Sequence, residues 1–310
     1  MNRSIMLPKL FLFCLFMSVG LTGFYSCVEH KAPVTKLETP AFIGPENGTL
    51  MIIGGNAKDP LFLEKFKEYA GGEDANIIII PTAWEDNQIE SDSGFLKFKA
   101  RFEKVGFKNI TVLHTRDSSL ANKPEFYAPI AKATGVWFDG GRQWRIADGF
   151  LNTKTHEEFN KLLDRGGVIA GSSAGASIQG SYLARGDSKG NTVMMGDHEV
   201  GLGFLKNSAI DQHILVRNRQ FDIFEILKKH PELFGVGMDE NTGIVVKGNE
   251  FEVIGNSFVA IYDGTRFSRE RDTIYQLPAD SKEFYFLRKG DKYNLKDRKV
   301  IIPARSNPVE

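Results

Sequence analysis

Short apolar runs alternate with segments of helical periodicity along the first two thirds of the chain. The runs have the length of buried strands and cover residues 49–53, 76–80, 109–113, 135–138 and 168–170. Between them, apolar residues recur at a spacing of three or four, as in Phe95, Phe98 and Phe102. Strands that alternate with helices predict an α/β fold, here a three-layer sandwich in which helices cover both faces of a mainly parallel sheet.

Helix boundaries can be read at several points. Asp59 and Pro60 are expected to open a helix, because proline suits the first helical position, and Gly71 is expected to end it. Thr155 and Glu158 fit a capping box at the start of a later helix.

The sequence pattern changes after residue 243, where short strand-like segments replace the predicted helices. The last part of the chain is charged and holds short β-prone runs, so we expect residues 266–310 to form a small C-terminal β extension. The main folded domain is expected to cover residues 43–265.

The first 27 residues differ from the rest. Positive charges at Arg3 and Lys9 precede an uncharged stretch, residues 10–26, which has the length of a signal peptide's apolar region and is short for a membrane span. The small residue Ser26 before Cys27 resembles a bacterial lipoprotein processing site, with Cys27 as the lipidated residue and residues 28–42 as a tether. A plain secretory signal and an uncleaved anchor are the alternatives.

Composition narrows the range of possible functions. The 310 residues include 39 Lys and Arg against 39 Asp and Glu, and no long basic run interrupts this balance, so charge gives no reason to expect nucleic-acid binding. The only cysteines are Cys14 and Cys27, which excludes a cysteine nucleophile from the folded part.

A candidate nucleophile follows the last apolar run. Residues 171–175 read Gly-Ser-Ser-Ala-Gly and fit the G-x-S-x-G nucleophile elbow, which lifts the hydroxyl of Ser173 clear of the sheet. The N–H of Ala174 would stabilise an oxyanion at the start of a helix, expected at residues 176–183. The alternative is a glycine-rich strand-to-helix connection without chemistry.

A serine nucleophile needs a base, and the base needs an acid that orients it. His213 and His198 are close competitors for the base on local sequence alone. Asp239 and Glu240 end an apolar strand, where α/β sheets present functional groups, and either can be the acid.

Several short blocks together carry a family resemblance over residues 49–262. They are residues 53–56 (Ile-Gly-Gly-Asn), 138–143 (Phe-Asp-Gly-Gly-Arg-Gln), 171–176 (Gly-Ser-Ser-Ala-Gly-Ala), 211–213 (Asp-Gln-His) and 236–242 (Val-Gly-Met-Asp-Glu-Asn-Thr). In order and spacing they resemble the cyanophycinase-like serine peptidases, relatives of dipeptidase E with a fold similar to class I glutamine amidotransferases.

The resemblance implies a catalytic triad of Ser173, His213 and Glu240, with Asp239 as the nearby alternative acid. It also implies that the glycine pair ending in Gly141 gives the oxyanion hole a second N–H beside that of Ala174.

The resemblance further assigns substrate binding to Gln143, Arg217 and Arg219, the two arginines holding substrate carboxylates. The family's third basic position is occupied here by Asp222, and Arg142 stands where an acidic or small residue is more usual. Both departures bear on which anionic group the site can hold.

The resulting expectation is an exported, lipid-anchored serine exopeptidase, on the periplasmic or cell-surface side of a bacterial membrane. It would hydrolyse an amide bond beside an acidic residue, such as a β-aspartyl bond, without a metal or other cofactor. The expected partners are a peptide or isopeptide substrate and, through the lipid anchor, a membrane; nucleic acid is not expected, and a homodimer is left open. A non-catalytic binding lipoprotein and an esterase are the alternative functions.

Overall fold

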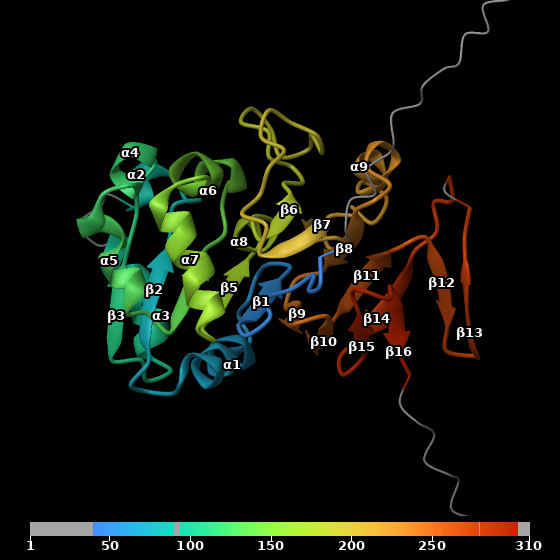
Figure 1. Ribbon diagram of the computed structural model, residues 1–310, viewed down its shortest axis with the longest axis horizontal. Coiled ribbons are helices and arrows are strands. Elements are labelled where there is room, and N and C mark those ends of the chain that lie inside the picture. Colours follow the sequence, from blue (N-terminus) through green and yellow to red (C-terminus); the bar gives the residue numbers. More distant parts are fainter. Residues whose placement is uncertain (1–39, 90–93, 279, 303–310) are drawn as a thin grey trace, which may run out of the picture. The chain divides into compact units, whose positions relative to one another are not determined.

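A nine-stranded sheet lies at the centre of the fold, and five of its strands are parallel neighbours (Figure 1). In spatial order these are β1 (Thr49–Ile53), β5 (Val168–Ser172), β4 (Gly135–Phe138), β2 (Asn76–Ile80) and β3 (Asn109–Val112). Every residue of β1 and β4 is buried, as their uninterrupted apolar sequences predict.

The computed structural model describes residues 40–89, 94–278 and 280–302. The predicted signal peptide, Cys27 and most of the predicted tether lie outside the described residues. The fold described below belongs to the unit that begins at Pro40. Within its described residues, no helix is both long and apolar enough to cross a membrane.

Helices cover both faces of the parallel strands. Each strand contributes apolar side chains to both faces, because successive side chains point in opposite directions. Met51 and Ile53 pack with the phenylalanines of one group of helices, whereas Leu50 and Ile52 pack with the other group. The first group is α1 (Pro60–Ala70) and α3 (Gly94–Glu103), and the second is α5 (Pro124–Ala131), α6 (Gln143–Phe150) and α7 (Lys154–Asp164). The predicted three-layer α/β fold with a mainly parallel core is confirmed.

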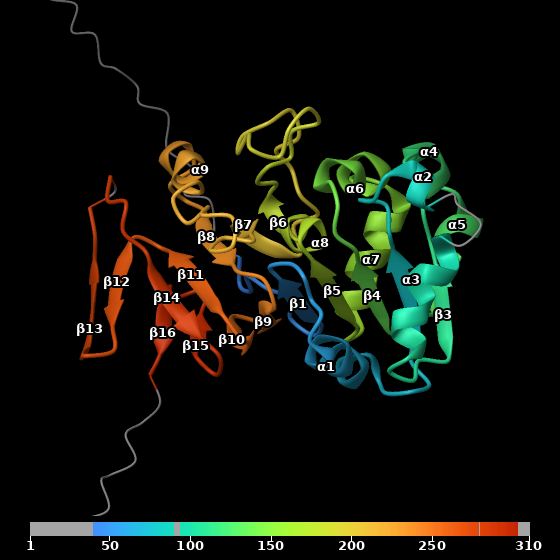
Figure 2. The same cartoon turned by 180° about the vertical axis from the view of Figure 1, so that it is seen from behind.

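The other half of the large sheet is antiparallel. It continues from β1 through β9 (Thr242–Lys247), β10 (Glu250–Gly255), β15 (Lys292–Asn294) and β16 (Lys299–Ile301). Figures 1 and 2 show this strand-rich half, in orange and red, beside the helix-covered half.

A second sheet of five strands packs its inner face on the same core as α6 and α7. Its order is β14 (Tyr285–Arg288), β11 (Phe258–Tyr262), β8 (Phe234–Met238), β7 (Leu205–Gln212) and β6 (Gly180–Tyr182), and α9 (Phe224–Lys229) lies on its outer face. Strands β12 (Thr265–Ser268) and β13 (Arg271–Gln276) form a separate hairpin. Short helices complete the described elements: α2 (Asp86–Ile89), α4 (Ser118–Ala121) and α8 (Ala174–Ser177).

The C-terminal extension contributes strands to both sheets, and one buried carboxylate lies between them. Asp263 Oδ2 accepts hydrogen bonds from the hydroxyls of Tyr285 at 2.7 Å and Tyr293 at 2.6 Å, and these tyrosines belong to β14 and β15. Burial and the charge of Asp263 raise the pKa of Tyr285. The extension is therefore built into the fold through a polar contact that its own strand pattern does not reveal.

The helix ends in the structure agree with the sequence-based prediction for one helix and differ from it for two. Asp59 caps α1, which has Pro60 in its first turn, and Gly71 ends it at a φ of 102°. The predicted capping box at Thr155 is wrong: Thr153 is the N-cap of α7, and Thr155 instead donates to the carbonyl of Ala121 at 2.6 Å.

The helix expected at residues 176–183 is also wrong. Helix α8 occupies only Ala174–Ser177, and the chain then becomes β6, which pairs in parallel with β7. Gly180 opens this strand, and glycine is a poor helix former, so sheet pairing prevails there.

Candidate active site

Ser173 lies on a sharp turn between β5 and α8. Its φ is 58°, a left-handed value that non-glycine residues seldom adopt, and its N–H donates to the carbonyl of Ile53 at 2.9 Å. A Cβ at Gly171 would lie 2.1 Å from the carbonyl oxygen of Gly175, and one at Gly175 would lie 2.2 Å from that of Phe138. Both glycines of the motif are therefore required by close backbone approach, which gives the turn its shape.

His213 approaches Ser173 from the second sheet. It follows β7 directly, with a φ of 55°, and its N–H donates to the carbonyl of Gly54 at 3.0 Å, just after β1 of the first sheet. A Cβ at Gly55 would lie 2.1 Å from His213 Cε1, so only glycine leaves room for the ring. The Nε2 atom of His213 lies 2.8 Å from Ser173 Oγ.

Glu240 and Asp239 take different positions although they are adjacent. Glu240 Oε1 lies 2.7 Å from His213 Nδ1. Asp239 Oδ1 accepts the backbone N–H groups of Leu215 and Val216, each at 3.1 Å, and its Oδ2 accepts the hydroxyl of Ser257. Asp239 thus shapes the loop after His213, and Glu240 is the carboxylate within hydrogen-bond reach of the imidazole.

The pairing of parallel strands explains why His213 and Glu240 meet, and the backbone N–H groups of both Ser173 and His213 donate to the end of β1 or the residue after it. Strand β8 pairs with β7 so that Met238 lies beside Gln212, which sets the residues that follow each strand side by side. All of them lie at carboxyl ends of parallel strands, where α/β sheets display functional groups.

The glycine pair of the Phe-Asp-Gly-Gly block lies against Ser173. A Cβ on Gly140 would be 3.2 Å from the Cβ of Ser173, and Gly141, at a φ of 132°, could not carry one without meeting the carbonyl of Ala83 at 2.1 Å. Among the described residues, neither the N–H of Gly141 nor that of Ala174 has a hydrogen-bond acceptor. Both donors are therefore available to an oxygen beside Ser173 Oγ.

Asp139, which precedes the glycine pair, holds this turn through its side-chain contacts. Its Oδ1 accepts the indole N–H of Trp137 at 2.9 Å and also pairs with Arg101 of α3. The carboxylate is almost fully buried, so it fixes the chain immediately before the glycine pair.

The charge state of His213 is set by its surroundings. Burial and the positive charge of Arg217 lower the pKa of the imidazole below its usual value, while the hydrogen bond to Glu240 acts in the opposite direction. The ring is therefore neutral down to a lower pH than a free histidine, as a general base requires.

The three predicted substrate-binding residues lie in different environments. Arg217 is exposed on the turn after His213, and its N–H donates to the carbonyl of His213 at 3.0 Å. Arg219 is buried, with Nη1 at 3.3 Å from both oxygens of Gln212, and burial and the charge of Arg185 lower its pKa to about 10. Gln143 is buried at the start of α6, where its Nε2 donates to the carbonyl of Ala184 at 2.7 Å.

One charged residue near this site is not indicated by the sequence pattern. Arg185 is 1% exposed and binds Asp211 through two hydrogen bonds of 2.8 and 2.9 Å and Asp222 through a third of 2.6 Å. Its signal in the sequence is weak, because a single arginine between small and apolar residues gives no indication of partners 26 and 37 residues away.

His198, the competing histidine, has other partners. Its Nε2 lies 2.8 Å from Asp148 of α6 and its Nδ1 lies 2.8 Å from Asp197. Arg142 donates to the carbonyl of Asp187 in the same loop, which connects β6 with β7 and is drawn in yellow beside α6 in Figures 1 and 2. These contacts fasten the loop to α6, and they occupy both ring nitrogens of His198.

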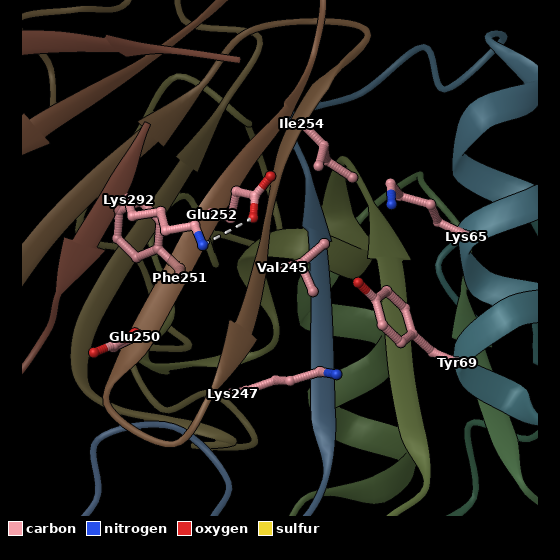
Figure 3. A pocket seen from close by; sticks show the side chains of 9 residues that line it. All are labelled: Lys65, Tyr69, Val245, Lys247, Glu250, Phe251, Glu252, Ile254 and Lys292. Atoms are coloured by element: carbon pink, nitrogen blue, oxygen red, sulfur yellow. Dashed lines mark ion pairs between the residues drawn. The ribbon is translucent and has the colours of Figure 1, made fainter. Parts of the chain in front are cut away.

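A separate hollow of about 240 Å³ lies on the face of the large sheet beside α1 (Figure 3). Lys247 Nζ lies 4.6 Å from the centre of the Tyr69 ring, and Lys292 pairs with Glu252 at 3.8 Å. Because β9 runs antiparallel to β1, Lys247 is at the end of the sheet opposite Ser173, and this hollow is distinct from the candidate active site.

Within the part of the chain that the structure describes, no three His, Cys, Asp or Glu residues are grouped so that they could hold a metal ion. The described site consists of a serine, an imidazole, a carboxylate and backbone N–H donors, which together suit nucleophilic acyl transfer.

The chain is similar in sequence and in fold to known peptidases. The model of peptidase family S51 matches residues 50–254. The chain is 32% identical over 260 residues to a cyanophycinase of Geminocystis herdmanii, covering 80% of this chain and 94% of the relative. It is 28% identical to a cyanophycinase of Trichormus variabilis, covering 83% and 88%. The crystal structure of a peptidase from an acI-B1 Actinobacterium has a similar fold, with a TM-score of 0.60 at 22% identity over 81% of this chain and 98% of that one.

Proposed function

The chain belongs to peptidase family S51, and from that premise we propose that it is an exopeptidase that cleaves an amide bond beside an acidic residue. Family membership makes the protein a cyanophycinase-like serine-type peptidase, a hydrolase, which acts on a peptide-type substrate. The observation that carries the finer proposal is the hydrogen-bonded series from Ser173 Oγ through His213 to Glu240, with distances of 2.8 and 2.7 Å.

In the proposed reaction, Ser173 Oγ attacks the scissile carbonyl while His213 Nε2 takes its proton. Glu240 accepts a hydrogen bond from Nδ1, which orients the ring and stabilises the imidazolium that forms. The carbonyl oxygen becomes negative and accepts hydrogen bonds from the N–H groups of Ala174 and Gly141. His213 then gives its proton to the leaving amine, and water repeats the sequence to release the acyl group.

The proposed preference for an acidic residue follows from Arg217 and Arg219. Neither guanidinium has an ion pair among the described residues, and both lie within six residues of His213 in the sequence. An unpaired arginine beside the reacting bond suits a substrate carboxylate, which a planar guanidinium holds at two points. We propose a β-aspartyl bond as the scissile amide, and Gln143 as a further substrate contact.

A panel of matched dipeptides tests the proposed substrate. The purified protein is expected to hydrolyse β-aspartyl dipeptides faster than α-aspartyl dipeptides, and both faster than the corresponding asparaginyl amides. Hydrolysis is measured as release of free amino acids, and ester analogues of the same acids are included to compare bond types. Equal rates on aspartyl and asparaginyl compounds would remove the arginines from substrate recognition.

The rate of serine labelling should depend on pH through His213. The imidazole must be neutral to act as a base, so reactivity is lost as the pH falls through its pKa. Because burial and Arg217 lower that pKa, the loss should occur below the pH at which an ordinary histidine titrates. The measurement is the rate of labelling by an uncharged fluorophosphonate between pH 4 and 9, which avoids effects on substrate binding.

The variant Arg217→Gln should move the acid limb of the pH profile, the range over which reactivity is lost on acidification, to higher pH. Removing the nearby positive charge makes the imidazolium less unfavourable, so the pKa of His213 rises and reactivity is lost sooner on acidification. Arg217→Lys keeps the charge and should leave the limb in place. A limb at the same pH in Arg217→Gln and wild type would contradict this electrostatic account.

Export through a lipid anchor is a separate proposal, supported by the uncharged stretch at residues 10–26 and by Ser26 before Cys27. Expressed in bacteria with radioactive palmitate, the wild-type protein should incorporate label and fractionate with membranes. Cys27→Ser should incorporate none, and label in that variant would rule out Cys27 as the modified residue.

A further inference from the structure

Arg185 is the most deeply buried arginine near the active site, and all its contacts are inside the protein. It lies in the loop after β6 with a φ of 58°, and its N–H donates to the carbonyl of Met194 at 3.0 Å. The guanidinium binds both oxygens of Asp211, one oxygen of Asp222, and the carbonyl of Asn191 at 3.1 Å. One positive charge therefore faces two carboxylates.

Those two carboxylates bracket the segment that carries the base and the free arginines. Asp211 is 1% exposed and precedes His213 by two residues, and Asp222 follows Arg219 by three. Each of them attracts the Arg219 guanidinium electrostatically, whereas Arg185 repels it. Yet among the described residues the Arg219 guanidinium hydrogen-bonds only to the neutral oxygens of Gln212, while Arg185 holds both carboxylates.

We propose that Arg185 is a positioning residue of the substrate site: it holds Asp211 and Asp222 away from Arg219, and so leaves Arg219 free to bind a substrate carboxylate. The inference rests on the proposed function for the class of substrate. Its physical basis is competition, because an arginine that pairs with an internal carboxylate has fewer N–H donors left for a ligand.

The same network gives Asp222 a role. Its side chain is 39% exposed, so its carboxylate is only partly removed from water and would be the more mobile partner if Arg185 were absent. Arg185 holds this carboxylate from another loop, through Nη2 at 2.6 Å. Both carboxylates are then hydrogen-bonded to Arg185 rather than to Arg219.

Binding measurements in an inactive background separate this role from turnover. In Ser173→Ala, calorimetry should show tighter binding of a β-aspartyl dipeptide than of the same dipeptide whose aspartyl α-carboxylate is a carboxamide. Adding Arg185→Gln should reduce this preference by about tenfold or more, since a charge-assisted contact to the carboxylate is lost. The carboxamide should bind almost equally in both proteins.

Removing the competing acids should restore the preference. Arg185→Gln combined with Asp211→Asn and Asp222→Asn should discriminate between the two ligands to within about threefold of the parent protein. Arg165→Gln is the matched control, because Arg165 also donates to backbone carbonyls, those of Ile130 and Ala133, but lies at the end of α7. It should leave the preference unchanged.

A purely structural role for Arg185 predicts a different result. Arg185→Gln would then melt at a lower temperature but keep the preference of the parent protein, and that outcome would overturn the proposal. Where Arg185→Gln does not fold, Arg185→Lys gives the same answer. A single ammonium group cannot reproduce the two-point contact with Asp211 and still hold Asp222, so the preference should fall and Asp222→Asn should restore it.

The outcomes for the two proposals are distinguishable. A wild-type protein that binds the dipeptide without cleaving it contradicts the proposed activity and leaves the competition model intact. An unchanged preference in Arg185→Gln contradicts only the role of Arg185. A dipeptide and a carboxamide that bind equally to Ser173→Ala contradict carboxylate recognition, and with it both proposals.

Discussion

Replacing Ser173 by alanine should abolish hydrolysis. With the nucleophile removed, kcat is expected to fall by about 10⁴- to 10⁶-fold, the range observed when a triad serine is deleted. The turn depends on the two flanking glycines and on the hydrogen bond from the N–H of Ser173 to Ile53, which alanine keeps, so the variant should remain folded. Initial rates on the best β-aspartyl dipeptide, together with labelling by a fluorophosphonate, measure the effect.

Ser177 provides the matched control. It lies four residues further on, at the end of α8, and its buried hydroxyl has no hydrogen-bond partner among the described residues. Ser177→Ala removes the same atom from a position without chemistry, and it should keep a rate within about twofold of wild type, because an unsatisfied hydroxyl contributes little. Hydrolysis or labelling that persists in Ser173→Ala would place the nucleophile elsewhere.

Sequence predicted the parallel half of the fold because its information is local. Strands buried on both faces must be largely apolar, and β1, β4 and residues 77–80 of β2 follow that rule. The elbow at Ser173 is local in its sequence pattern, and Gly171 is required by a contact four residues away, although Gly175 is required by Phe138 of the neighbouring strand.

Errors in the prediction arose where distant contacts prevail over local preference. Thr155 has the spacing of a helix cap, yet its hydroxyl contacts Ala121, 34 residues earlier, and Thr153 caps the helix instead. The helix after Ser173 ends early because β6 pairs with β7, which begins 25 residues after Gly180. In both places the outcome depends on an element that the local window does not contain.

The candidate site shows the same limit. Local sequence could not rank His198 against His213 or Asp239 against Glu240, because it does not show which of them contact one another; only the family resemblance favoured one of each pair. The difference is geometric: Glu240 is 2.7 Å from His213 Nδ1, whereas His198 binds Asp148 and Asp197. The sequence does not indicate Arg185 for the same reason, because its role depends on Asp211 and Asp222, which are distant in sequence.

Glu240→Gln is the second change expected to have a large effect. A carboxylate can only accept from His213, so it requires the proton on Nδ1 and leaves the lone pair of Nε2 facing Ser173. A glutamine can present its own N–H to Nδ1, which favours the tautomer with the proton on Nε2 and removes the base. The expected loss in kcat is about 10⁴-fold, or about 5.4 kcal/mol in activation free energy.

Asp239→Asn should behave differently although the residue is adjacent. Its carboxylate accepts from Leu215, Val216 and Ser257, and an amide oxygen can keep the two backbone contacts. We expect a loss of about 1 kcal/mol in the free energy of unfolding, for one weakened hydrogen bond, and less than about a tenfold change in kcat. Parallel kcat measurements and urea unfolding compare the variants. If Asp239→Asn lowers kcat as far as Glu240→Gln, the assignment of the acid to Glu240 fails, because a residue that only shapes the loop cannot control the tautomer of His213.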